Sequence, residues 1–133
     1  MAEKQFEPLD ETTEKTITAI IDCSFTVFTK LGPGLLESVY ESCLCHELKK
    51  NGILFRRQVH LPIVYDGEQL SEGLRIDILV NENIIVELKA VEQMIPLFKS
   101  QLITYLKLTH HRIGLLINFN VTNFKGAVKR IIL

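Results

Sequence analysis

The sequence predicts a mixed α/β domain in which helices flank a short central sheet. In the N-terminal third, apolar residues recur every three or four positions, as in amphipathic helices. The middle of the chain changes to short runs of β-branched residues, which are typical of strands. With 133 residues, the chain is long enough for one domain with its own core. We expect the order ααβββαβ, followed by a tail.

Two helices are expected before the first strand. The first spans residues 10–31, and Asp10 and the two threonines that follow are its candidate N-caps. Gly32-Pro33-Gly34 ends this helix. The second spans about residues 35–50, and Gly52 follows it where a left-handed residue is favoured. Residues 1–9 are expected to be a flexible lead-in to a single domain.

The remaining elements are assigned from the spacing of apolar residues and from the positions of the prolines. Pro62 interrupts or curves the first strand, because proline cannot donate a ladder hydrogen bond, and Pro96 suits the first turn of a helix. The amphipathic tail, from about residue 122 to 133, fits either a last helix or a last strand. The expected strands are residues 53–65, 74–80, 84–90 and 113–119, and the expected helix is residues 96–109.

Charged residues interrupt two strands that are otherwise apolar. Glu87 and Lys89 lie two apart in one strand and therefore share a face. A three-residue turn at 81–83 places Asp77, in the preceding strand, opposite Glu87, with Cβ atoms roughly 4.5–5.5 Å apart. A buried charge is costly unless it is paired or bound to a cation. The sequence thus gathers two carboxylates and one ammonium on one face of the sheet.

Two interpretations of this triad are open. One is a structural cluster of salt bridges among the three side chains. The other is a site for Mg²⁺ or Mn²⁺, in which water and a substrate phosphate complete the coordination. We favour the metal, because two close carboxylates repel each other and one lysine offsets only part of that repulsion.

The spacing of these residues resembles the core signature of the PD-(D/E)XK nuclease superfamily, although Ile76 stands where proline is usual. The segment from Gly34 to Tyr40 resembles the motif that names the GxxExxY family within it. The resemblance runs from about residue 15 to the C-terminus. Further matches are Gln58 and Pro62, the Gln-x-x-x-Tyr motif of RecB-like nucleases at Gln101 and Tyr105, and residues 114–119.

The resemblance implies a restriction-endonuclease-like fold and assigns roles to individual residues. Asp77, Glu87 and the Leu88 carbonyl would hold Mg²⁺ or Mn²⁺. Lys89 would orient the attacking water and stabilise phosphate charge. Glu37 would be a further ligand or would hold water at the edge of the site, and Gln101 would lie near it. Three of the helix residues also have structural explanations: Glu37 as an exposed first-turn residue, and Gln101 and Tyr105 as a surface pair.

The charge distribution indicates a partner. The net charge is −1, yet residues 93–133 contain six basic and no acidic residues. This third of the chain could face a polyanion, with Tyr105, Lys125, Lys129 and Arg130 as the nucleic-acid-binding residues. The alternative is that folding mixes both halves and leaves no basic surface.

Composition also excludes some classes of protein. No apolar run approaches the ~18 residues of a membrane span, and the acidic N-terminus is not a signal peptide. Together with three cysteines, this predicts a cytoplasmic protein with reduced thiols. The acidic triad and the family resemblance imply a Mg²⁺-dependent nuclease, with DNA as the expected substrate. The alternative is a weakly active or inactive module that binds nucleic acid or protein. Sequence specificity would come from loops, from a homodimer or from a protein partner.

Overall fold

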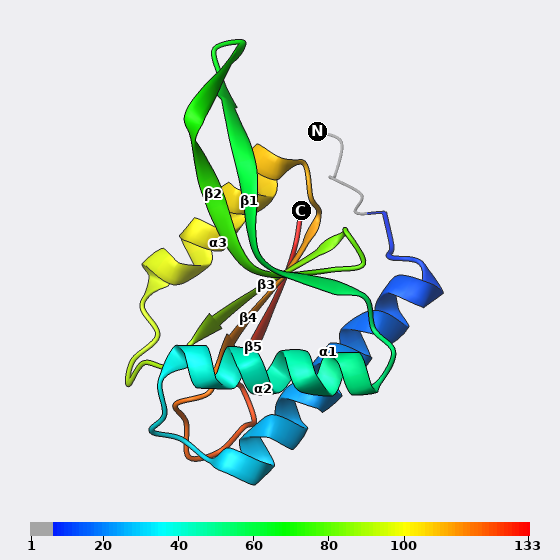
Figure 1. Cartoon of the computed structure of the whole chain (residues 1–133), viewed down its shortest axis with the longest axis vertical. Helices are drawn as coiled ribbons and strands as arrows, with labels where there is room; N and C mark the ends of the chain where they lie inside the picture. Colours follow the sequence, from blue (N-terminus) through cyan, green and yellow to red (C-terminus); the bar gives the residue numbers. More distant parts are fainter. Residues whose placement is uncertain (1–6) are drawn as a thin grey trace, which may run out of the picture.

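The computed structural model describes residues 7–133, which form three helices and a five-stranded sheet (Figure 1). The strands lie in the order β1-β2-β3-β4-β5, and only β3 and β4 run parallel to each other. The elements are α1 (Glu11–Leu31), α2 (Glu37–Lys50), β1 (Phe55–Tyr65), β2 (Glu68–Val80), β3 (Ile84–Lys89), α3 (Pro96–Thr109), β4 (Ile113–Asn118) and β5 (Val128–Ile132).

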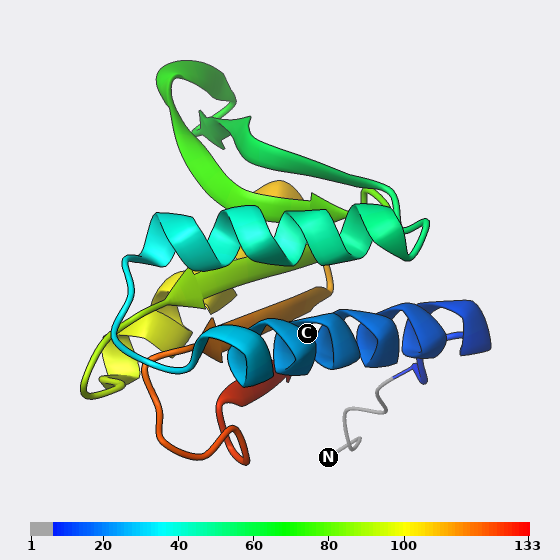
Figure 2. The ribbon, with the colours of Figure 1, turned by 60° about the horizontal axis from the view of Figure 1, so that its bottom comes forward.

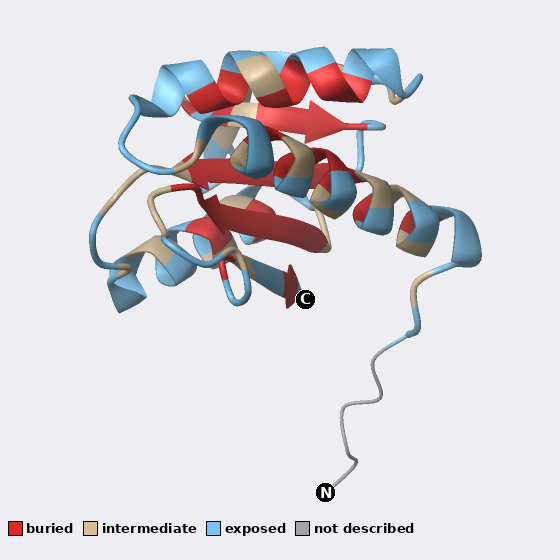
Figure 3. Ribbon diagram, turned by 90° about the horizontal axis from the view of Figure 1, so that it is seen from below, coloured by how far each residue is buried: buried red, intermediate tan, exposed pale blue. Residues whose placement is uncertain are grey.

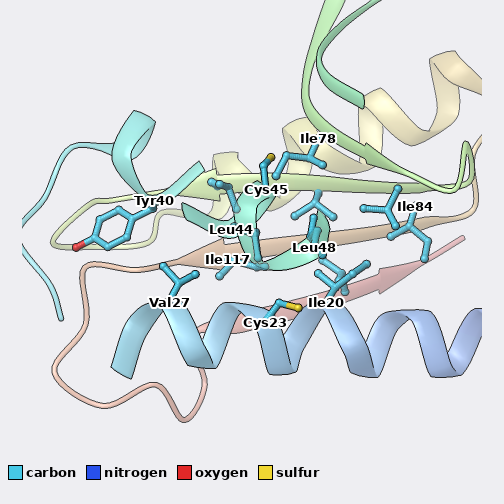
Figure 4. Close-up of a cluster of buried hydrophobic side chains, with 14 of the residues drawn as sticks. Ile20, Cys23, Val27, Tyr40, Leu44, Cys45, Leu48, Ile78, Ile84 and Ile117 are labelled. Atoms are coloured by element: carbon cyan, nitrogen blue, oxygen red, sulfur yellow. The ribbon is translucent and has the colours of Figure 1, made fainter. Parts of the chain in front are cut away.

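Helices cover both faces of the sheet. Helices α1 and α2 lie on one face and α3 lies on the other (Figure 2). The central strands are buried on both faces, as their continuous apolar sequences predict (Figure 3). Two apolar clusters result. The larger one joins α1 and α2 to the sheet, with Ile20, Leu44 and Ile84 among its fully buried members (Figure 4). The smaller one packs α3 against the opposite face.

The mixed α/β class and most of the predicted elements are confirmed. The helix predicted at residues 96–109 is α3, and the turn at residues 81–83 joins β2 to β3. The strand predicted at residues 74–80 begins earlier, at Glu68, because polar residues form one arm of a hairpin that projects from the body (Figure 1). The tail forms a strand, β5, that pairs with β4.

The predicted lead-in falls partly outside the described residues, which begin at Glu7. Residues 7–10 belong to no helix or strand, but they contact the body. Leu9 packs against the larger core cluster, and the Glu7 carbonyl accepts a hydrogen bond from Arg112 (2.8 Å). Asp10 is the N-cap of α1, accepting from the Thr13 N–H at 2.7 Å.

Two further expectations concern membranes and cysteines. None of the helices within residues 7–133 is long and apolar enough to cross a membrane. Cys23, Cys43 and Cys45 are all free thiols. Burial raises the pKa of the Cys45 thiol to about 11, so this thiol stays protonated at neutral pH.

A shared bend in β1 and β2 positions the residues discussed below. The ladder pairs Arg57 with Ile78 and Val59 with Ile76, but Gln58 and Asp77 between them are not paired. Gln58 has a φ of 48°, a left-handed value that costs about 1 kcal/mol or more for a residue other than glycine. The ladder between β2 and β3 ends nearby, at Ile78 and Val86. Strand β2 therefore leaves β3 at Asp77.

Helix α3 packs closely on β4 because Gly114 has no side chain. A Cβ at Gly114 would lie 2.9 Å from both methyl carbons of Leu102, which is 1% exposed and cannot move aside freely. We expect Gly114→Ala to destabilise the protein by about 1–3 kcal/mol through overpacking, as measured by urea denaturation.

The matched control is the same change in a Leu102→Ala background, where the new methyl group enters a cavity. There the cost of Gly114→Ala should disappear or reverse. An equal cost in both backgrounds would mean that contact with Leu102 does not explain the glycine.

Candidate active site

Two carboxylates occupy the gap where β2 leaves β3. The Asp77 N–H donates a hydrogen bond to Oε1 of Glu87 (3.2 Å), and the Leu88 N–H donates one to Oδ2 of Asp77 (2.8 Å). The predicted opposition of Asp77 and Glu87 is therefore present, and the side chains replace the ladder bonds that end at Ile78. Apart from the hydrogen bond between the two carboxyl groups themselves, the second oxygen of each receives no hydrogen bond from residues 7–133. No buried polar atom there lacks a partner, so these oxygens reach solvent.

Glu87 is strongly perturbed by this environment. Glu87 is only 7% exposed. This burial, together with the adjacent Asp77 carboxylate, raises the pKa of Glu87 to about 8. The hydrogen bond from the Asp77 N–H and the Lys89 charge act in the opposite direction but do not cancel the effect. A cation bound to the two carboxyl groups would favour the ionised form of Glu87.

A tyrosine anchor brings Glu37 to the same site. The Tyr40 hydroxyl donates to the Gly32 carbonyl (2.6 Å) and accepts from the Leu35 N–H (3.1 Å). Its ring stacks on the buried Phe119 ring at 4.7 Å. These contacts fix the turn before α2, so that Glu37 is the first residue of the helix.

Glu37 is exposed, but it lies within the electrostatic field of the other site residues. Partial desolvation raises the pKa of Glu37, the Asp77 carboxylate raises it further, and the Lys89 ammonium lowers it. The structure therefore brings Glu37, Asp77, Glu87 and Lys89 to one end of the sheet.

Lys89 does not form the salt-bridge cluster that was the alternative to a metal site. Its Nζ lies 4.5 Å from the centroid of the Phe98 ring. None of the ion pairs among residues 7–133 includes Lys89. The two carboxylates are thus left without a directly bound cation.

The two predicted residues of α3 differ in their position. Tyr105 is half-buried, and desolvation, the Glu87 carboxylate and the Asp77 carboxylate all raise its pKa. Its phenol therefore faces the carboxylate pair. Gln101, one turn earlier, is exposed and makes no side-chain hydrogen bond within the described residues.

Sequence analysis missed a second polar cluster beside Glu37. Glu41, one turn along α2, is 6% exposed, and its carboxylate accepts hydrogen bonds from Arg57 (2.8 Å) and from the Gln58 amide. This cluster ties α2 to the bend in β1. The available signal was a glutamate at helical spacing with the buried Leu44 and Leu48.

Asn118 is a further residue that sequence reasoning did not single out. It is 3% exposed, and its side-chain amide bonds both the N–H (3.1 Å) and the carbonyl (3.0 Å) of Val91. Asn118 pairs with Lys89 in the sheet, so it fixes the loop that leads from Lys89 to α3.

The three cations predicted to bind nucleic acid do not form one basic surface. Arg130 forms an ion pair with Glu14 of α1 (2.9 Å). Lys125 follows Phe124, whose ring packs against Phe25 and Phe28 of α1. Lys129 alone lies on the α3 face, opposite Leu116, which in turn pairs with Glu87. Adjacent strand residues alternate between faces, so Lys129 and Arg130 must point apart.

The donor set fits a small hard cation. Within residues 7–133, no three His, Cys, Asp or Glu side chains lie together as a ready-made metal site. Mg²⁺ does not require one, because it is commonly held by one or two carboxylates and keeps several waters. Asp77 and Glu87 supply two carboxylates, each with one free oxygen.

Comparison with known proteins identifies the family. A model of the PD-(D/E)XK nuclease superfamily matches residues 14–131. No curated protein and no solved structure gives a match. The match does not distinguish the GxxExxY or RecB-like groups, which stay predictions. Since it covers nearly all of the described residues and includes the acidic site, the chain belongs to the PD-(D/E)XK nuclease superfamily.

Proposed function

We propose that this chain is a divalent-metal-dependent nuclease that hydrolyses phosphodiester bonds, with DNA as the expected substrate. The observation that carries the proposal is the Asp77–Glu87 pair, in which Glu87 is buried, Asp77 is half-buried and no ammonium of the described residues forms an ion pair with either. Members of the superfamily are generally nucleases and typically use divalent metals, which supports this assignment.

Asp77, Glu87 and the Leu88 carbonyl are the proposed ligands for Mg²⁺ or Mn²⁺. In an extended strand, the N–H and the carbonyl of one residue point to the same side. The Leu88 N–H is directed at Asp77, so the Leu88 carbonyl faces the same gap. Two carboxylates and one carbonyl leave coordination positions for water and a phosphate oxygen.

The metal, when bound, lowers the pKa of its water and neutralises phosphate charge. The residues of the chain supply the rest. Lys89 carries the positive charge that stabilises the phosphate oxygens as the P–O bond breaks. Glu37 faces the site from α2 and accepts a proton or a hydrogen bond from the attacking water. Tyr105 and Gln101 contact the substrate from α3.

The alternative is a binding module on the same fold. The placement of Lys129 and Arg130 on opposite faces of the sheet favours its protein-binding form, because these two predicted cations do not face one polyanion together. A module without metal chemistry, however, gains nothing from setting the Asp77 carboxylate against the buried Glu87, where it makes the ionisation of Glu87 costly. We therefore prefer the nuclease. A cytoplasmic location, and a homodimer or protein partner that supplies specificity, also belong to this proposal.

The pH dependence of stability tests the carboxylate pair. Native Glu87 has a pKa near 8 and the unfolded side chain one near 4.5, so the native state holds an extra proton between these values. The metal-free protein should therefore lose stability, by a few kcal/mol at most, as pH rises through this window. Mn²⁺ should raise the Tm more at high pH than at low pH, because it binds the ionised pair.

Thermal melts with and without Mn²⁺ across this range measure both effects. Glu87→Gln should remove this pH slope and the Mn²⁺ increment, and Asp77→Asn should reduce both. If Glu87→Gln keeps the wild-type slope and increment, the pair is not the metal site.

Lys89 tests the proposed chemistry. Lys89→Ala should slow cleavage by ~10²–10³-fold, because the variant lacks the charge that stabilises the transition state. Binding of nucleic acid should change little. Lys89→Arg should not restore the full rate, since the guanidinium has a different size and donor geometry.

The assay is single-turnover cleavage of single- and double-stranded DNA and RNA with Mg²⁺, Mn²⁺ or EDTA. Lys15→Ala is the matched control, because Lys15 is exposed and pairs only with Glu11 of the same helix. Equal rates for Lys89→Ala and wild type, or cleavage that survives EDTA, would exclude the proposed mechanism. Binding without cleavage would establish the alternative module.

Charge reversal at Lys129 and at Arg130, which lie on opposite faces of β5, tests which face binds the substrate. Lys129→Glu should weaken DNA binding and lower the salt slope of the affinity by about one. Arg130→Glu should affect binding less, because Arg130 is already paired with Glu14 on the opposite face. Fluorescence anisotropy at several salt concentrations measures both. A larger effect of Arg130→Glu would place the substrate on the α1 side.

A further inference from the structure

The Lys89 ammonium lies over the ring of Phe98, a residue of α3. The Nζ of Lys89 lies 4.5 Å from the ring centroid of Phe98, which is within cation–π range. We infer that Phe98 is a positioning residue whose ring keeps Lys89 off the Asp77–Glu87 pair, so that the cation position remains open. The inference rests on the proposed function, because it assumes that a metal binds there.

Without the ring, electrostatic attraction would draw the Lys89 ammonium toward the carboxylates. It lies two residues from Glu87 on the same strand, and its charge acts on both Glu87 and Glu37. A lysine side chain is long and flexible, and a poorly solvated carboxylate attracts an ammonium strongly. Yet Lys89 makes no ion pair among the described residues. The negative face of the Phe98 ring is the competing partner that the structure shows.

The position of the ring is set by the fold and not by the lysine. Phe98 lies in the first turn of α3, which begins at Pro96, and packs against the apolar cluster beneath that helix. Asn118 fixes the loop between β3 and α3 by bonding both backbone groups of Val91. The ring is therefore a stationary surface, and the mobile ammonium settles on it.

This arrangement matters because two cations compete for one pair of carboxylates. An ammonium bound between Asp77 and Glu87 would have to be displaced before a divalent ion could bind. Held over Phe98, Lys89 leaves the pair free and stays beside the site, where it can meet a phosphate. Phe98 thus separates the lysine from the metal ligands without contacting either metal or substrate.

Isothermal titration of the metal-free protein with Mn²⁺ tests this inference. Phe98→Leu should bind Mn²⁺ about tenfold more weakly, which corresponds to about 1.4 kcal/mol, because Lys89 now occupies the pair. Phe98→Tyr retains the ring face and should bind like wild type. Phe25→Leu is the matched control, since Phe25 is 53% exposed on α1 and packs against Phe124, not Lys89.

A Lys89→Met background separates positioning from packing. Methionine has no ammonium that could compete with Mn²⁺ for the Asp77–Glu87 pair. Phe98→Leu should therefore no longer change Mn²⁺ affinity in that background. Lys89→Met alone should bind Mn²⁺ at least as tightly as wild type. A proton NMR spectrum of the metal-free protein adds an independent readout. The ε-protons of Lys89 should show an upfield ring-current shift that Phe98→Leu abolishes and Phe98→Tyr preserves.

The outcomes are distinct. If wild type binds Mn²⁺ and Phe98→Leu binds it equally well, the inference fails and the proposed function stands. If Phe98→Leu weakens binding equally in both backgrounds, Phe98 acts through packing and the inference also fails. If wild type binds neither Mn²⁺ nor Mg²⁺, the proposed function fails and the inference fails with it.

Discussion

The close approach of the half-buried Asp77 carboxylate to the buried Glu87 carboxyl group is the constraint around which this end of the sheet is organised. Asp77 and Glu87 would be unfavourable neighbours on a regular ladder, so the ladder stops at Ile78 and their oxygens accept the N–H groups it leaves unpaired. The break is local, because β3 continues to pair with β4 in parallel through Lys89. The backbone hydrogen bonds given up on one side of β3 are thus exchanged for bonds to the carboxyl groups of Asp77 and Glu87.

The bend in β1 and β2 and the start of α2 are held by the same kind of exchange. Gln58 adopts a left-handed backbone conformation and has no ladder partner in β2. Its side-chain amide donates a hydrogen bond to the buried Glu41 carboxylate. Glu41 also binds Arg57, so α2 and β1 are tied one turn from Glu37. At the start of the helix, the hydroxyl of Tyr40 forms hydrogen bonds with two backbone groups of the preceding turn, while its ring stacks on Phe119 in the core. Each anchor joins a rigid element to the carboxylate gap, which gives side chains from separate elements a defined geometry.

The sequence predicted local features and failed where distant segments meet. Pro96 marked the start of α3, and the short turn before Ile84 was enough to set Asp77 opposite Glu87, because register follows from turn length. The hairpin arm of β2 was missed because its residues face solvent on a projecting ribbon and carry no apolar alternation. The contact of Lys89 with Phe98 depends on how a helix is set against the sheet, which no local pattern reports. The basic C-terminal third was divided for another reason: the sequence left the tail open as a helix or a strand, and alternation along β5 turned Lys129 and Arg130 to opposite faces.

That division has a consequence for how a polyanion could be held. Arg130 is bound to Glu14 and Arg57 to Glu41, so these two cations are already paired within the fold. Lys89 is in no ion pair among the described residues, and its charge acts on Glu87. A divalent ion between Asp77 and Glu87 would change this balance, because it converts a site that repels phosphate into one that attracts it. In this proposal the metal relieves the strain of the buried pair and creates the electrostatic condition for substrate binding. Stability, binding and cleavage would then depend on the same two carboxylates.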